Sequence, residues 1–385
     1  MRWKILVVLF VARVGLGFQF QTLGSVGNSL SDVFALDYGT IGLLIGLFML
    51  PGIILTLPAG YISRFVSDKT MVVAGLLILA LRGFLSSAAS GVALIGFVRI
   101  VAGVGFLATN LYFTKMVADW FDGREMATAM GILVPSWPLG IALGQVVNAW
   151  LELSFGWQIP FVVASVYCFV SALAVYAFYH SPKPVIDKAA NSGAHMSLNE
   201  WRLILCAAVI WGVFNSGYVI YLSFGPNLLV GFGYSEISAA GVISLGSWLM
   251  IFSNTICGQI VDRYGYSLTI LSICMGSAVL SLMLLSIFGA GLSASLLLGI
   301  LGMAPAGVIM SLAGTALRPQ VRATGMAAFY TVYFAFMALT PPIAGRLIDI
   351  FHQEYAPIIL AIFMFGIAVP ISLVYRHFAI LGRKA

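Results

Sequence analysis

Three arginines are the residues in this sequence whose type and position most directly predict chemistry. Arg13, Arg82 and Arg99 lie inside long apolar runs, whereas none of the 13 Asp and Glu residues falls near the middle of one. An ionisable side chain at membrane depth is costly and usually faces a polar cavity. A guanidinium can grip a carboxylate or similar planar anion with two hydrogen bonds. Three embedded cations without an embedded anion therefore predict a site for an anion.

The composition of the chain predicts a membrane protein. Of its 385 residues, 61% are hydrophobic and only 8% are charged, whereas soluble domains carry about 25% charged residues. A soluble protein of this composition would expose large apolar patches. The net charge of +6 does not indicate nucleic-acid binding, because the basic residues are scattered through short loops. The four cysteines lack the spacing of a metal site or a disulfide framework.

Twelve apolar segments are long enough to cross a bilayer as helices, which takes about 20 residues each. The first segment is longer than the apolar core of a signal peptide, which has about 7–15 residues, and no small-residue cleavage site follows it. We therefore expect it to be the first span. The expected spans cover residues 5–30, 40–63, 70–90, 92–117, 126–151, 158–179, 203–225, 235–261, 268–287, 293–317, 323–348 and 355–375.

The basic residues also predict the orientation. With both termini in the cytosol, almost all Lys and Arg residues between the spans lie on the cytosolic side, and Arg346 is the exception outside. This is the positive-inside pattern, and we expect the protein in the cytoplasmic (inner) membrane. Residues 181–200 form the one long polar stretch. We expect them to be a cytosolic linker between two six-helix bundles, residues 1–180 and 201–385.

The two halves carry matching landmarks. The chain reads GYISRF at residues 60–65, after the second span, and GQIVDRYG at residues 258–265, after the eighth. ATAM at residues 127–130 and ATGM at residues 323–326 precede the fifth and eleventh spans at nearly the same offset. Parallel repeats with a site near the midplane are the plan of many secondary transporters.

At these residues the chain resembles the major facilitator superfamily, whose loop motif has the form Gly-x-Leu-x-Asp-Arg-x-Gly. The copy that starts at Gly258 matches with Ile260 in the Leu place, whereas the first copy has Arg64 for Asp and Ser67 for the second Gly. The likeness extends to three further segments, which are RIVAGVG at residues 99–105, DWF at 119–121 and RE at 124–125. The resemblance implies an all-α membrane protein with twelve transmembrane helices in two pseudo-symmetric six-helix bundles.

Within the superfamily, the chain looks most like the cyanate-permease-like branch of small-anion and organic-anion carriers. Arg13, Arg82 and SWPLG at residues 136–140 carry this likeness, while the glycine-rich signature of nitrate porters and an Arg in the seventh span are missing.

Proline and glycine are frequent in the fifth span. They are compatible with tight helix packing and with a bend that shapes two alternating states. The positions are Gly131, Pro135, Pro138, Gly140 and Gly144.

The candidate substrate ligands start with the arginines. Arg13 lies about 12–14 Å into its helix, near the midplane, and Arg82 has a similar depth. Because the first and fourth spans line the cavity in the superfamily, the resemblance favours Arg13 and Arg99 over Arg82. Hydrogen bonding between helices is the alternative role for each. The other expected substrate-binding residues are Gln21, Asn110, Asn215, Tyr218 and Tyr330.

A cytosolic gate is predicted around the second loop motif. By pseudo-symmetry Asp262 should lie near the start of the fifth span, where a helix N-terminus and an arginine favour a carboxylate. We expect it to hold the outward-open state, and a fixed loop brace is the alternative. The expected gate residues are Gly258, Asp262, Arg263, Arg124 and Arg322.

These features predict an alternating-access transporter of a small anion, either an inorganic anion or a monocarboxylate. The sequence has no embedded carboxylate to relay protons, so facilitated diffusion, anion exchange and symport stay open while proton antiport is disfavoured. We expect no enzymatic activity, cofactor, metal or nucleic-acid partner, and a functional monomer in the bilayer. The alternative is an exporter of lipophilic drugs or other small hydrophobic compounds, which the 27 Phe and 15 Met would suit.

Overall fold

The computed structural model describes residues 2–62, 66–121, 125–181 and 195–382. Over these ranges the secondary structure is entirely helical, and twelve helical segments are long and apolar enough to cross a membrane. This confirms the predicted all-α membrane fold with twelve spans. The chain forms two compact units, one of residues 1–36 and 47–188 and one of residues 37–46 and 189–385. Residues 37–46, which we expected in the N-terminal bundle, are part of the second unit.

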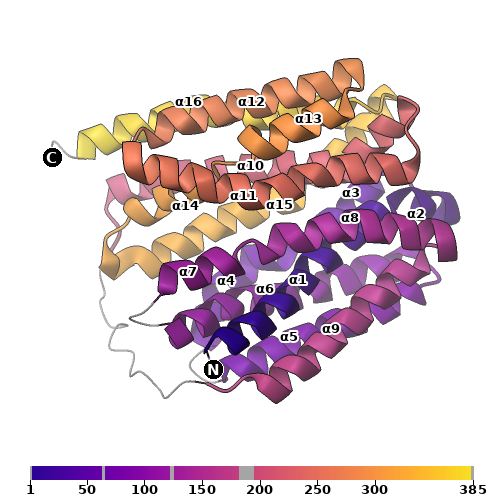
Figure 1. The fold of residues 1–385 in the computed structure, drawn as a ribbon, viewed down its shortest axis with the longest axis horizontal. Helices are drawn as coiled ribbons and strands as arrows, with labels where there is room; N and C mark the ends of the chain where they lie inside the picture. Colours follow the sequence, from indigo (N-terminus) through magenta and orange to yellow (C-terminus); the bar gives the residue numbers. More distant parts are fainter. Residues whose placement is uncertain (1, 63–65, 122–124, 182–194, 383–385) are drawn as a thin grey trace. The chain divides into compact units, whose positions relative to one another are not determined.

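In the first unit, α1 packs beside α8 and α9, and α5 packs against α6 and α9 (Figure 1). The helices of this unit are α1 (Arg2–Ser25), α2 (Gly27–Phe34), α4 (Leu50–Ile62), α5 (Asp68–Ser87), α6 (Val92–Phe121), α7 (Met126–Leu133), α8 (Ser136–Phe155) and α9 (Gln158–Phe178).

In the second unit, α10 packs beside α15 and α16, and α12 packs against α13 and α16. Each pairing has its counterpart in the first unit, as the matching sequence landmarks predict. The helices are α3 (Tyr38–Leu47), α10 (Leu198–Gly231), α11 (Glu236–Tyr264), α12 (Ser267–Phe288), α13 (Gly291–Leu297), a π-helical turn (Leu298–Gly302), α14 (Ala306–Thr315), a 3₁₀ turn (Pro319–Val321), α15 (Arg322–Phe351) and α16 (Ala356–Gly382).

Three spans that the hydropathy pattern predicts as continuous helices are broken. The second span is interrupted at 48–49, just before Pro51, the fifth at 134–135, and the tenth at 303–305 after the π-helical turn. Each break lies close to a proline. A proline favours a break because it has no backbone N–H to donate and because its ring crowds the preceding turn of the helix. The first span also ends earlier than expected, at Ser25, and a separate α2 follows it.

Helix ends at the membrane boundaries are marked by local sequence. Ser197 and Glu200 form a reciprocal capping box that starts α10, and the Ser67 hydroxyl accepts from the N–H of Thr70 at the start of α5. Such caps satisfy backbone donors that lack helical partners. The last glycine of the loop motif, Gly265, ends α11 with φ at +72°, a conformation that side-chain-bearing residues rarely adopt.

Candidate functional site

Arg13 is held where α1 meets the break between α7 and α8. Its Nη1 donates to the carbonyl oxygen of Leu133 at 2.9 Å and of Val134 at 3.3 Å, and to Oγ of Ser136 at 3.1 Å. Its Nη2 donates to Oδ1 of Asn110, on α6, at 3.1 Å. These four acceptors are neutral oxygens, and they orient the guanidinium.

The α7–α8 break explains why those carbonyls accept from a side chain. In a continuous helix the carbonyl of Val134 would accept from the residue four positions later, but that residue is Pro138, which has no N–H. The Ser136 hydroxyl also donates to the Leu133 carbonyl, at 2.6 Å. The prolines of the fifth span therefore both break the helix and create oxygen acceptors for Arg13.

Gly140 and Gly144 of the fifth span lie at close helix contacts. A Cβ atom on Gly140 would lie 2.1 Å from the carbonyl oxygen of Val14, and one on Gly17 would lie 2.4 Å from that of Trp137. Small residues permit such close backbone approach between membrane helices. The fifth span thus has a break at residues 134–135 and a tight helix crossing at Gly140.

Arg82 lies away from the Arg13 cluster. It is 1% exposed, its Nη1 donates to Oε1 of Gln19, and its guanidinium lies 5.2 Å from the ring centre of Phe161. Its Nε and Nη2 have no hydrogen-bond partner in the described part of the chain. Gln19 in turn donates to the carbonyl of Leu79 at 3.1 Å, so this pair joins α1 to α5.

Arg99 and Gln21 are also buried in separate surroundings. The Arg99 guanidinium lies 4.8 Å from the ring centre of Phe48, a cation–π geometry, and the residue is fully buried. Gln21 is 2% exposed, and its Cβ lies where a side chain on Gly144 would clash. Of the expected first-unit ligands, the structure therefore brings together Arg13 and Asn110.

In the second unit, the expected ligands on α10 make intramolecular bonds. Nδ2 of Asn215 donates to the carbonyl of Trp211, one turn earlier, at 2.8 Å, and the residue is half-buried. The Tyr218 hydroxyl is hydrogen-bonded to that of Ser247 on α11 and is buried. Asn215 therefore retains an exposed edge, whereas Tyr218 ties two helices together.

Tyr330 belongs to an aromatic cluster that joins α10 and α15. Its ring centre lies 5.3 Å from that of Phe329 and 6.3 Å from that of Tyr333, both on α15. Trp211 on α10 lies 6.2 Å from Tyr333. Trp211, Tyr330 and Tyr333 are half-buried. Trp211 was not among the predicted ligands, and its position one turn before Asn215 within an apolar span was the available signal.

The family model of the Major Facilitator Superfamily matches residues 9–335. The chain belongs to this superfamily. The hexuronate transporter of Bacillus subtilis (strain 168) is 23% identical over 276 residues, which cover 69% of this chain and 65% of that protein. The probable L-galactonate transporter of Escherichia coli (strain K12) is 24% identical over 54% of this chain and 48% of that protein. The matches thus span about two thirds and about half of these relatives' lengths.

A solved structure extends the comparison to nearly the whole chain. The inward-facing, unoccupied structure of a bacterial homologue of the human lysosomal transporter Spinster matches with a TM-score of 0.76 and 15% identity, covering 98% of each chain. At that identity the likeness shows the fold alone.

The superfamily loop motif ends α11. Asp262 and Arg263 are exposed, and the Arg263 guanidinium lies 5.4 Å from the ring centre of Tyr264. A Cβ atom on Gly258 would meet no atom within 4 Å. Arg124 lies outside the described residues, and Arg322 begins α15 with a side chain that is not among those described.

Ion pairs in the described ranges lie at the ends of spans. They join Arg2 to Glu125 at 2.7 Å and Lys115 to Asp68 at 2.9 Å in the first unit. In the second unit they join Arg318 to Glu200 at 2.8 Å, and Arg346 to Asp37 and Asp349. The hydrogen bond that Arg318 donates to the Glu200 carboxylate raises the pKa of Arg318. The pairing of Asp37 with Arg346 was not predicted, because the two residues are 309 positions apart in the sequence.

Proposed function

We propose that this superfamily member is a secondary transporter, and not an enzyme, that carries a small organic anion across the cytoplasmic membrane by alternating access. The observation that carries the proposal is the Arg13 guanidinium, half-buried in a membrane span and oriented by neutral oxygens. Arginine binds carboxylates through a planar fork of donors. A bound carboxylate would accept hydrogen bonds from this fork of donors.

The relatives support an organic carboxylate over an inorganic anion. The two reported relatives are named for hexuronate and L-galactonate, which are hydroxylated carboxylates. The likeness to the cyanate-permease-like branch rests on Arg13, Arg82 and residues 136–140, and it agrees with the anionic charge of the substrate. We propose a monomer in the inner membrane with both termini cytosolic, in line with the distribution of basic residues.

We further propose that some of the expected ligands contact the substrate, whereas the others stabilise the helix packing. Arg13 and Asn110 contact the substrate from the first unit, and the half-buried Asn215 and Tyr330 contact it from the second. Arg82, Arg99, Gln21 and Tyr218 are at least 97% buried in their own packing environments. Their role in this proposal is to hold the helices that carry the ligands.

The cytosolic gate remains part of the proposal. Asp262 and Arg263 are exposed at the end of α11, so they are available to bind another segment as the transporter changes state. Arg124 and Arg322 are the proposed basic partners. Gly265, with φ at +72°, ends the helix whose last turn carries Asp262 and Arg263.

The experiment is uptake into proteoliposomes from a panel that contains galacturonate, galactonate, a simple monocarboxylate, cyanate, a neutral sugar and a lipophilic cation. The variants are Arg13→Ala and Arg13→Lys, and the matched control is Arg376→Ala, an exposed arginine near the end of α16. We expect carboxylate uptake by the parent and the control, loss in Arg13→Ala, and a raised KM in Arg13→Lys because the fork is lost. Uptake of the cation or neutral sugar alone, or normal carboxylate uptake by Arg13→Ala, contradicts the proposal and favours the drug-exporter alternative.

A further inference from the structure

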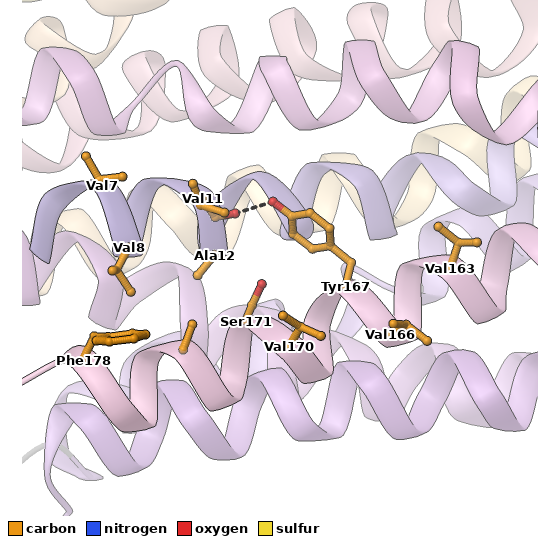
Figure 2. A pocket seen from close by; sticks show the side chains of 11 residues that line it. Val7, Val8, Val11, Ala12, Val163, Val166, Tyr167, Val170, Ser171 and Phe178 are labelled. Carbon is orange, nitrogen blue, oxygen red and sulfur yellow. Dashed lines mark hydrogen bonds between the residues drawn. The ribbon is translucent and has the colours of Figure 1, made fainter. Parts of the chain in front are cut away.

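A groove with a volume of about 500 Å³ runs between α1 and α9 on the surface of the first unit (Figure 2). Three valines of α1, Val7, Val8 and Val11, line one side, and Val163, Val166 and Val170 line the other. Val7 is 61% exposed and Val170 is 56% exposed. Both walls belong to membrane spans, so the surroundings of this groove are lipid hydrocarbon.

The walls of the groove are rigid. Valine has two heavy atoms on Cβ, and its χ1 angle is strongly restricted in a helix. The Tyr167 hydroxyl donates to the carbonyl oxygen of Val11 at 2.6 Å, as the dashed line in Figure 2 shows. A Cβ atom on Gly15 would lie 2.6 Å from the Tyr167 ring, so this glycine makes room for the ring. These contacts fix α9 against α1 and preform the groove, which lowers the entropic cost of filling it.

The groove has the length of an acyl chain. It extends along α9 from Phe178, the last residue of the helix, to Val163. At 1.5 Å per residue this is about 22 Å, more than half of a hydrocarbon core that is about 30 Å thick. A chain that enters at the membrane boundary beside Phe178 can therefore lie in the groove over the full depth of its leaflet.

A basic residue lies at the end of the groove where a headgroup would be. Lys4 is exposed on α1 and precedes Val7 and Val8 by three and four residues, so it shares their helix face. Lysines at the membrane surface attract anionic headgroups. Together with the apolar walls and the length, this charge selects a lipid as the occupant over a second protein helix.

We propose that the α1–α9 groove is a binding site for an anionic phospholipid, with one acyl chain between the valine walls and the phosphate at Lys4. The site is independent of the proposed anion transport, because Arg13 bonds toward α6, α7 and α8 and does not line the groove.

The test is native mass spectrometry of the full-length protein released from vesicles of equal parts phosphatidylglycerol and phosphatidylcholine. Val11→Trp and Val170→Phe fill the groove from opposite walls, and Lys4→Gln removes the charge. Leu81→Trp is the control, since Leu81 on α5 is 58% exposed outside the groove. We expect the parent and Leu81→Trp to retain phosphatidylglycerol over phosphatidylcholine by about fivefold, as one lysine would give.

Both groove-filling variants should lose this retained lipid, and Lys4→Gln should retain lipid without preference for its headgroup. Equal retention by the parent and both groove-filling variants overturns the proposal, because it means that general annular lipid is being counted. A dimer of the parent that disappears when the groove is filled also overturns it and assigns the groove to a second copy. Thermal unfolding of each variant in detergent separates these results from a failure to fold.

Discussion

The carboxylate of Asp349 caps the helix that begins beside Gly39. Its Oδ2 accepts from the N–H of Gly39 at 2.8 Å, and its Oδ1 accepts from that of Tyr38 at 2.9 Å. Asp349 lies on α15, late in the chain. Its carboxylate provides the hydrogen-bond acceptors for the first backbone N–H groups of α3. A carboxylate at a helix N-terminus also interacts favourably with the helix dipole.

Replacing Asp349 with alanine should destabilise the second unit by about 0.5–2 kcal/mol, the usual cost of losing a helix cap. The measurement is the thermal unfolding midpoint in detergent. Asp32→Ala is the control, because Asp32 is an exposed acid on α2. Equal midpoints for the parent and Asp349→Ala contradict a capping role.

The neighbouring acid, Asp37, should make the stability depend on pH. Hydrogen bonds from Thr40, with a further contribution from Arg346, lower the pKa of Asp37. Its stabilisation is therefore complete above the unfolded-state pKa of about 3.9 and is lost as the pH falls through the lower folded-state pKa. Unfolding midpoints between pH 6 and pH 3 should fall less steeply for Asp37→Asn than for the parent. Identical slopes would exclude this linkage.

Close packing of α3 on α15 requires a glycine at position 42. A Cβ atom there would lie 2.1 Å from the carbonyl oxygen of Pro341, a backbone atom that cannot rotate away. Gly42→Ala should destabilise the protein by about 1–3 kcal/mol through overpacking. Gly241→Ala on α11 is the matched control, since its Cβ would meet nothing within 4 Å, and it should be neutral or stabilising by up to about 1 kcal/mol. The reverse order of unfolding midpoints would refute the packing argument.

The buried pair of Gln19 and Arg82 should respond unequally to the loss of either partner. Gln19→Leu removes the hydrogen-bond acceptor of a buried cation and should cost more than about 3 kcal/mol, because an unsatisfied charged group costs more than a neutral one. Arg82→Met leaves a neutral amide oxygen without its donor and should cost about 1–3 kcal/mol. The measurement is the unfolding midpoint of each single variant and of the double variant, which shows which of the two substitutions destabilises the protein more. If Arg82→Met is the more damaging change, the guanidinium has a further partner that offsets its burial.

The proposed gate predicts a specific effect at the end of α11. Asp262→Asn keeps the size of the side chain but removes the charge, so it should lower the turnover number with little change in substrate affinity. Uptake and binding are measured on the same preparation. Glu236→Gln, at the opposite end of α11, is the control. Unchanged turnover in Asp262→Asn means that the residue is a loop brace.

The sequence alone determined the class and plan of this protein. Twelve apolar runs of sufficient length can be only helices in a bilayer, because no water is available there for free backbone groups. The matched motifs at residues 60–65 and 258–265 predicted two repeats, and the same helix pairings are found in both units. Pro135 and Pro138 signalled an irregularity in the fifth span, since proline removes a backbone donor whatever its surroundings.

Only the tertiary structure decided which embedded polar groups meet. Arg13 and Asn110 come together, whereas Arg82 at similar depth pairs with Gln19. Sequence spacing gives the depth of a residue in its own helix, but its partners depend on how neighbouring helices rotate and cross. The placement of residues 37–46 with α15 and the role of Asp349 as a cap have the same origin. They arise from close backbone approach between segments about 300 residues apart, for which no local pattern carries a signal.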